Sequence, residues 1–188
     1  MNSPDNRTHH HLGFNLFVKG EADGRAGRFI VAVSDTQHAK WRLRIGDVFR
    51  GTAWTCIKAK HDIADYYRAG GFKALSRADE LTDSSGPPFR GLLPAIAVFE
   101  RRGPRMLDGK LWRKQCFACM WANKSAVEIE YKFGKVKHYR KETFCYGPRS
   151  CPLYDMGPPS EVPYFDTFPV IDDGWMDDLC TERRGNED

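Results

Sequence analysis

The sequence lacks any apolar run near the roughly 20 residues that a membrane-spanning helix needs. It also lacks a Gly-rich phosphate loop, a nucleophile elbow and a paired-histidine metal motif. Its 41% hydrophobic and 29% charged residues are ordinary for a globular chain. We therefore expect a soluble protein, and the absence of these motifs disfavours an enzyme.

The first residues lack the basic segment and apolar core of a signal peptide. We accordingly expect residues 1–12 to form a flexible leader, and we expect a cytoplasmic location in which thiols stay reduced. A chain of 188 residues buries enough surface to fold without disulfides. The six cysteines are therefore candidates for a metal site before they are candidates for cross-links.

Charge is distributed unevenly along the chain, although the total is only +4. Residues 101–150 hold thirteen Lys or Arg against four acids, a net of +9. Residues 161–188 hold nine acids against two Arg, a net of −7. The basic excess lies in the cysteine region, and the end of the printed sequence is an acidic, aromatic tail.

Alternating apolar and polar residues predict a mainly β first domain over residues 13–105. Segments 14–20 and 28–34 flank a turn-rich stretch and predict a hairpin. The long alternating segment 41–58 contains Gly46 and Gly51, which predict bulges or bends in a strand. Its pattern "RLRIGDVFRGTAW" resembles a strand of a small five-stranded OB-like barrel, and an SH3-like barrel or a small sandwich fits the same signals.

Two further segments carry weaker patterns. Residues 63–75 fit either a short helix that ends at Gly70 and Gly71 or two short strands joined by a tight turn. Residues 95–102, just after Pro94, predict another strand.

Four cysteines define a second module, predicted over residues 106–160. The stretch "AVEIEYKF" alternates with period two, Gly134 makes a turn, and "KVKHYRKETF" returns as a second strand. This hairpin brings the two cysteine pairs together, and the arrangement resembles a zinc ribbon, although the second pair is spaced by five residues rather than two. The predicted zinc ligands are Cys116, Cys119, Cys145 and Cys151.

Two alternatives stay open for these cysteines. An iron–sulfur cluster fits the wide second gap and Pro152, which directly follows Cys151. Disulfides or ordinary buried thiols are the other interpretation. A closed four-cysteine zinc site leaves no position for a substrate, so zinc here would be structural.

Basic and aromatic residues interleave around the cysteines, as is typical of surfaces that bind single-stranded or structured RNA or DNA. A solvated basic surface and buried tryptophans would give the same composition. The predicted nucleic-acid contacts are Arg42, Arg44, Trp54, Arg113, Lys114, Trp121, Lys132, Lys135, Lys137, Tyr139, Arg140, Lys141 and Arg149.

Two other functions compete with nucleic-acid binding. The tail 161–188 mixes acids with large apolar residues, a composition typical of a segment that docks on a partner, so the chain is alternatively a protein-interaction adaptor. The tail could also cover the basic surface. Asp108, Glu130 and Lys132 resemble the Asp and Glu-x-Lys arrangement of a restriction-type, metal-dependent nuclease.

Overall fold

The computed structural model describes residues 13–57, 62–78, 86–131, 136–158, 160–161 and 170–171, with backbone alone for 128–131, 136–138, 160–161 and 170–171. The predicted leader and all of the acidic tail except residues 161 and 170–171 lie outside these ranges. Within them the chain is mainly β, as predicted. No helix in these ranges is long and apolar enough to cross a membrane.

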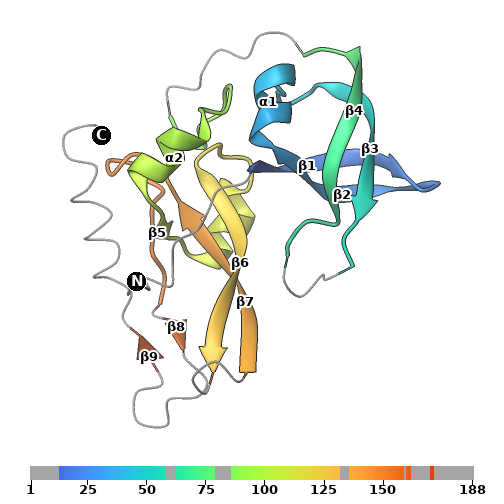
Figure 1. Cartoon of the computed structure of the whole chain (residues 1–188). Helices are drawn as coiled ribbons and strands as arrows, with labels where there is room; N and C mark the ends of the chain where they lie inside the picture. Colours follow the sequence, from blue (N-terminus) through green and yellow to red (C-terminus); the bar gives the residue numbers. More distant parts are fainter. Residues whose placement is uncertain are drawn as a thin grey trace.

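A four-stranded sheet and one helix make up what we call the first lobe (Figure 1). The predicted hairpin is confirmed: its two strands pair antiparallel around a turn at Asp23 and Gly24, both with positive φ. The strand order is β1-β2-β4-β3, with β2 and β4 parallel. The elements are β1 (Gly13–Ala22), β2 (Arg25–Ser34), α1 (Asp35–Trp41), β3 (Val48–Thr55) and β4 (Tyr66–Ser76).

The β3–β4 pair is strongly irregular. Eight residues of β3 face eleven of β4, and the register shifts at three places. Arg68 and Gly71 of β4 have φ of +52° and +59°. Bulges of this kind bend a strand and increase its twist. The bends that we predicted at the glycines of segment 41–58 therefore lie mainly in the partner strand, and the barrel itself stays a prediction.

Two predicted strands are wrong. Segment 41–58 does not begin as a strand, because residues 35–41 form α1 and β3 starts only at Val48. The Ser34 hydroxyl accepts the Gln37 backbone N–H at 3.3 Å and caps this helix. Residues 96–102 form a second helix, α2 (Ile96–Arg102), which ends at Gly103. The segment around Gly70 and Gly71 is one continuous strand rather than a helix or a tight turn.

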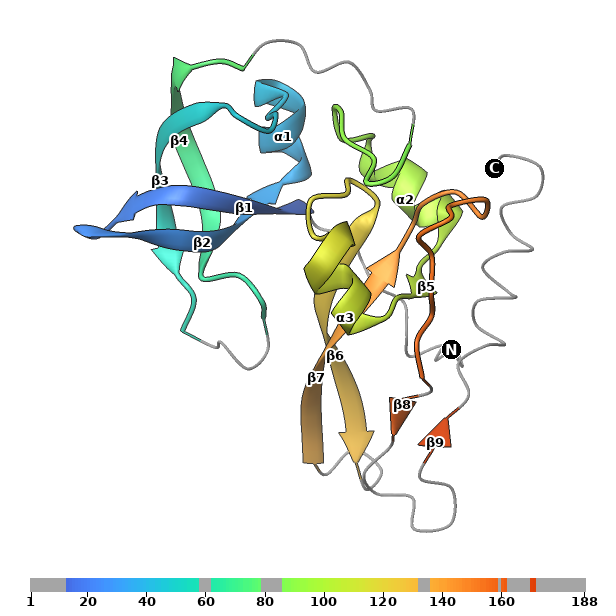
Figure 2. The same ribbon diagram turned by 180° about the vertical axis from the view of Figure 1, so that it is seen from behind.

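The second lobe contains α2 and a three-stranded antiparallel sheet of order β5-β7-β6. The predicted cysteine hairpin is confirmed, with Ala122 paired to Cys145 at its open end and Tyr131 paired to Val136 at the other. Figure 2 shows α3 between β6 and the first lobe. The elements are β5 (Arg105–Met106), α3 (Gly109–Leu111), the π-helical turn η1 (Trp112–Cys116), β6 (Ala122–Tyr131) and β7 (Val136–Cys145). A short pair, β8 (Ser160–Glu161) and β9 (Val170–Ile171), follows.

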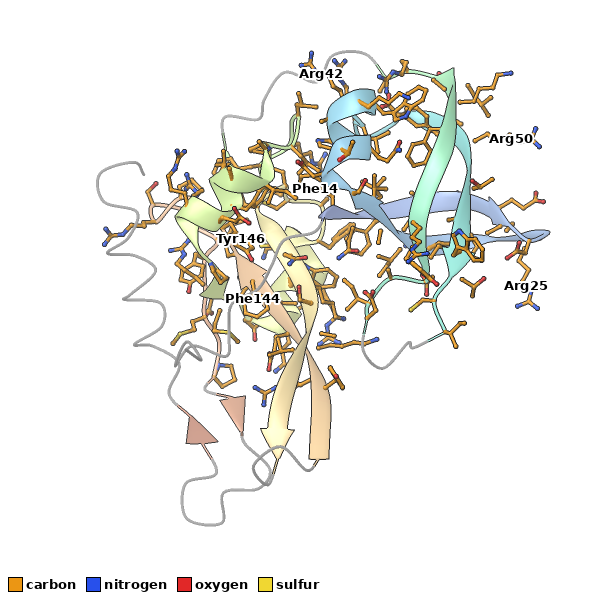
Figure 3. The ribbon with its side chains drawn as sticks, in the orientation of Figure 1. Phe14, Arg25, Arg42, Arg50, Phe144 and Tyr146 are labelled. Carbon is orange, nitrogen blue, oxygen red and sulfur yellow. The ribbon has the colours of Figure 1, made fainter. Side chains whose placement is uncertain are left out.

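Aromatic contacts join the two lobes. The Phe14 ring lies 4.6 Å from the His38 ring of α1 and 6.1 Å from the Phe99 ring of α2, centroid to centroid. Phe99 belongs to a buried cluster with Phe144 and Tyr146, toward which Phe14 extends from β1 (Figure 3). Burial lowers the pKa of His38, and a backbone hydrogen bond to Leu93 opposes this shift. The junction is therefore apolar and favours the neutral imidazole.

Gly51 permits a close approach between β3 and the Phe72 ring of β4. A Cβ at this position would lie 2.7 Å from Cδ1 of Phe72 and 3.0 Å from the Gly70 carbonyl oxygen. We expect Gly51→Ala to lower the free energy of unfolding by about 1–3 kcal/mol in urea titrations, because the Phe72 ring has to move.

Gly20→Ala in β1 is the matched control, since a Cβ there meets nothing within 4 Å. We expect this control to change the free energy of unfolding by less than about 0.5 kcal/mol. Equal midpoints and slopes for the two variants would contradict the packing around Gly51.

Candidate metal centre

The four predicted ligand cysteines line a single cavity of about 10 Å³. Cys116 ends η1, Cys119 lies in the following turn, and Cys145 is the last residue of β7. Cys151 follows in the loop that leaves β7. Because Ala122 pairs with Cys145 across the hairpin, the first cysteine turn lies directly beside the end of β7. No disulfide forms among the five described cysteines, which include Cys56.

Each cysteine pair is held by a tight turn with amides directed at sulfur. The Cys119 N–H donates to the Cys116 carbonyl at 2.9 Å, which closes the first turn. The Gly147 N–H donates to Cys145 Sγ at 3.3 Å. Burial raises the pKa of the Cys119 thiol, and backbone hydrogen bonds from Trp121 and Phe89 oppose this shift. Amides directed at sulfur stabilise a thiolate, as in the surroundings of metal-bound cysteines.

Burial and mutual repulsion nevertheless disfavour the thiolate forms of Cys116 and Cys119. Burial, together with negative charge on Cys119, Cys145 and Cys151, raises the pKa of Cys116 to about 11. Burial likewise raises the pKa of Cys119. Within the described residues no group of three or more Cys, His, Asp or Glu side chains is arranged so that it could hold a metal ion. The four sulfurs share one cavity, and binding an ion requires them to close on it.

The Arg105 side chain connects β5 to the loop between Cys145 and Cys151. This side chain is only 4% exposed, and its Nη2 donates to the carbonyls of Gly147 at 3.2 Å and Pro148 at 3.0 Å. The same nitrogen lies 3.9 Å from Cys145 Sγ, and the guanidinium stacks 3.8 Å from the centroid of the Tyr154 ring. Arg105 is one of the thirteen basic residues of the segment 101–150, and in the structure it is buried.

The charge of Arg105 has no carboxylate partner among the described residues. A buried cation without a counter-charge is costly, whereas a cation beside thiolates is compensated. The residues around the cavity therefore favour deprotonated sulfur, in opposition to the burial and repulsion that favour neutral thiols. A metal cation among the sulfurs resolves this conflict, because it makes deprotonation favourable.

Residues 87–89 complete the cavity from a distant part of the sequence. Pro87, Pro88 and Phe89 line it, and the Phe89 carbonyl accepts the Met120 N–H at 2.9 Å. A Gly-Pro-Pro stretch is typical of a loop, and no local pattern in the sequence links it to the cysteines.

The predicted nucleic-acid contacts divide into three groups. Trp121 packs inside the second lobe, 5.4 Å from the Phe99 ring and 4.7 Å beneath the Arg102 guanidinium. Arg44, Tyr139 and Arg140 are half-buried as well. Lys132, Lys135 and the side chain of Lys137 lie outside the described residues. The exposed members are Arg42, Trp54, Arg113, Lys114, Lys141 and Arg149.

The residues of the nuclease hypothesis are only partly described. The Asp108 carboxylate accepts the Leu111 N–H at 2.6 Å and caps α3, so it has a structural role. Glu130 lies in β6 opposite Lys137, without a described side chain. Lys132 lies outside the described residues.

No family model matches the chain, and neither the curated proteins nor the solved structures give a significant match. Evidence for function therefore comes from the residues and their geometry.

Arg105→Met tests the role of the buried guanidinium, because it keeps the length and apolar contact of the side chain and removes the donors. We expect the free energy of unfolding to fall by about 2–5 kcal/mol, since the buried Gly147 carbonyl and the half-buried Pro148 carbonyl each lose a donor. Thermal or urea unfolding of the protein as purified measures the change.

Lys110→Met is the matched control, because Lys110 is exposed on α3. We expect it to change the free energy of unfolding by less than about 0.5 kcal/mol. If the two variants were equally stable, Arg105 would not hold the loop.

Proposed function

We propose that the chain is a non-catalytic nucleic-acid-binding protein whose second lobe is held by a structural zinc ion on Cys116, Cys119, Cys145 and Cys151. One observation carries the proposal: the helical segment that leads into Cys116 exposes Lys110, Arg113 and Lys114. The residues that organise the metal site therefore also display cations to solvent.

We favour zinc over an iron–sulfur cluster because the two cysteine turns at one end of a hairpin resemble a zinc ribbon. Four thiolates around zinc form a closed tetrahedral site without an open position for a substrate. The metal in this proposal supplies folding energy to the lobe and takes part in no reaction.

The finer architecture belongs to the same proposal. The second lobe is zinc-ribbon-like, supported by two cysteine turns beside a three-stranded antiparallel sheet. The first lobe is a small OB-like barrel, supported by the bulged β3–β4 pair and by a core in which Trp41, Phe49 and Phe72 pack around Val33, Leu43 and Ala69.

Nucleic acid is the proposed partner because exposed cations occur on both lobes. Phosphates release counterions when cations bind them, and this term supplies most non-specific affinity. The adaptor role of the tail and the nuclease triad stay alternative hypotheses that rest on sequence composition and spacing. Neither has a contact among the described residues that favours it over nucleic-acid binding.

Metal analysis and an absorption spectrum of protein purified without chelator test the zinc ion. We expect about one zinc per chain and a colourless protein. Cys145→Ser should lose the metal and unfold the second lobe, because a folded metal site supplies folding energy.

Cys56→Ser is the matched control, since Cys56 lies just after β3 and outside the cavity lining. It should keep the metal. A brown protein with iron and sulfide, or a metal content unchanged by Cys145→Ser, would reject the proposed site.

Binding to fluorescein-labelled single-stranded oligonucleotides at several salt concentrations tests the partner. The logarithm of the binding constant should fall linearly with the logarithm of salt, by about 0.7 per neutralised phosphate. Replacing Lys110, Arg113 and Lys114 together with Ala should lower this slope by about 2.

Gln115→Ala, an exposed neutral residue of the same segment, controls for damage to the helical turn and should leave the slope unchanged. A wild-type protein that binds no oligonucleotide at low salt would reject nucleic-acid binding.

A further inference from the structure

We propose that one face of the β3–β4 pair is a single-strand-binding site, in which Trp54 and Tyr67 stack on unpaired bases while Arg50 and Lys73 hold phosphates. This inference rests on the proposed nucleic-acid binding and locates it. We call these four residues, together with Arg68, the β3–β4 face.

Arg50 and Lys73 are direct cross-strand partners. Both are exposed, and neither forms an ion pair with a described residue. Figure 3 shows Arg50 pointing away from the body of the molecule. Like charges directly opposite one another destabilise a sheet. A bound anion between the two side chains removes this repulsion, and phosphate has the charge and the acceptor oxygens to do so.

Trp54 and Tyr67 form the second cross-strand pair of the β3–β4 face. Trp54 is 66% exposed, so its large ring is not part of the core. The Arg68 guanidinium lies 5.7 Å from the centroid of the Tyr67 ring. Arg68 holds this position with φ of +52°, a strained region for a residue with a side chain. Exposed aromatics beside arginine are the usual stacking surface for unpaired bases.

The two pairs lie on the same side of the sheet. Phe49 and Phe72 pack together in the core at a centroid distance of 5.8 Å, so the odd-numbered positions of β3 face inward. Arg50 and Trp54 then share the outer side, because alternate residues of a strand point to opposite faces. Four residues of extended strand separate them by about 13 Å. A short oligonucleotide therefore reaches both pairs.

A second like-charged pair extends this outer side toward the β1–β2 hairpin. Lys19 and Arg28 are cross-strand partners and both are exposed. Because Leu16 packs in the core, Lys19, three positions further along β1, lies on the opposite, outer side. Glu21 is the acid on the same side of β1. The outer side thus combines cations at intervals with the exposed Trp54 ring beside the half-buried Tyr67 ring. This arrangement suits a backbone with bases splayed from it more than a duplex groove.

Fluorescence anisotropy with a fluorescein-labelled oligothymidylate of about 20 nucleotides tests this site on the full chain as purified. We expect Trp54→Ala to weaken binding about 5- to 100-fold, the range measured for loss of one stacked base. Arg50→Ala combined with Lys73→Ala should lower the salt slope by about 1.4. The same double variant should be at least as stable as the wild type, because it removes a like-charged pair.

Two matched controls separate a site from a general surface effect. Ile57→Ala removes an apolar side chain that is 90% exposed just beyond β3. Arg25→Ala removes an exposed cation at the tip of the β1–β2 hairpin (Figure 3). Both should bind within about twofold of the wild type.

Four other outcomes would overturn the proposed site or change its ligand. Salt-dependent wild-type binding with Trp54→Ala equal to Ile57→Ala would overturn the β3–β4 face and leave the proposed function intact. No binding by the wild type would overturn both. Equal competition by a duplex of the same length would overturn the single-strand assignment, and equal competition by polyglutamate would assign the face to an acidic protein instead.

Discussion

The second lobe depends on one buried cation. Arg105 connects β5 to the loop between Cys145 and Cys151 through two carbonyls, a sulfur and the Tyr154 ring. Without these bonds, the Gly147 and Pro148 carbonyls beside the cavity would each lose a hydrogen-bond donor. The guanidinium lies 3.9 Å from Cys145 Sγ and places a positive charge at the cavity. In the proposed zinc site, this charge would offset part of the negative charge of four thiolates.

The small size of the buried clusters explains why the second lobe depends on contacts with the first lobe. The second lobe has two small buried clusters, one of Leu107, Trp112 and two cysteines and one of Phe99, Phe144 and Tyr146. A core of this size needs a metal or a large neighbour to be stable. The first lobe supplies part of that support, because Phe14 packs against Phe99, and Phe17 lies 5.9 Å from Trp112. The two lobes therefore stabilise each other through aromatic contacts, while the cations stay outside.

Features that depend on local sequence patterns were predicted from the sequence, whereas features that depend on contacts between distant segments were not. The cysteine hairpin could be predicted because period-two alternation and a turn glycine lie within one continuous stretch. The helices α1 and α2 were not predicted, although the sequence contains a cap signal for each. Ser34 precedes α1, and Gly103 followed by Pro104 ends α2. Short alternating segments such as 95–102 fit a strand or a helix equally well, and only the burial of Phe99 decides between them. The burial of Arg105 and the role of residues 87–89 depend on chain segments that meet only after folding. Composition alone therefore predicts that this arginine is on the surface.

The distribution of charge and aromatic surface between the lobes bears on how a nucleic acid would be recognised. Cations on the α3–η1 segment attract any phosphate backbone and carry no information about whether the bases are paired. In the proposed site, the Trp54 and Tyr67 pair would act on bases that are unstacked, and this contribution would not be screened by salt as the ionic one is. Affinity at low salt would then come mostly from the second lobe, and discrimination of single strands from duplexes would come from the first. The proposed structural zinc would suit this arrangement, because it would keep the cations in place without taking part in a reaction.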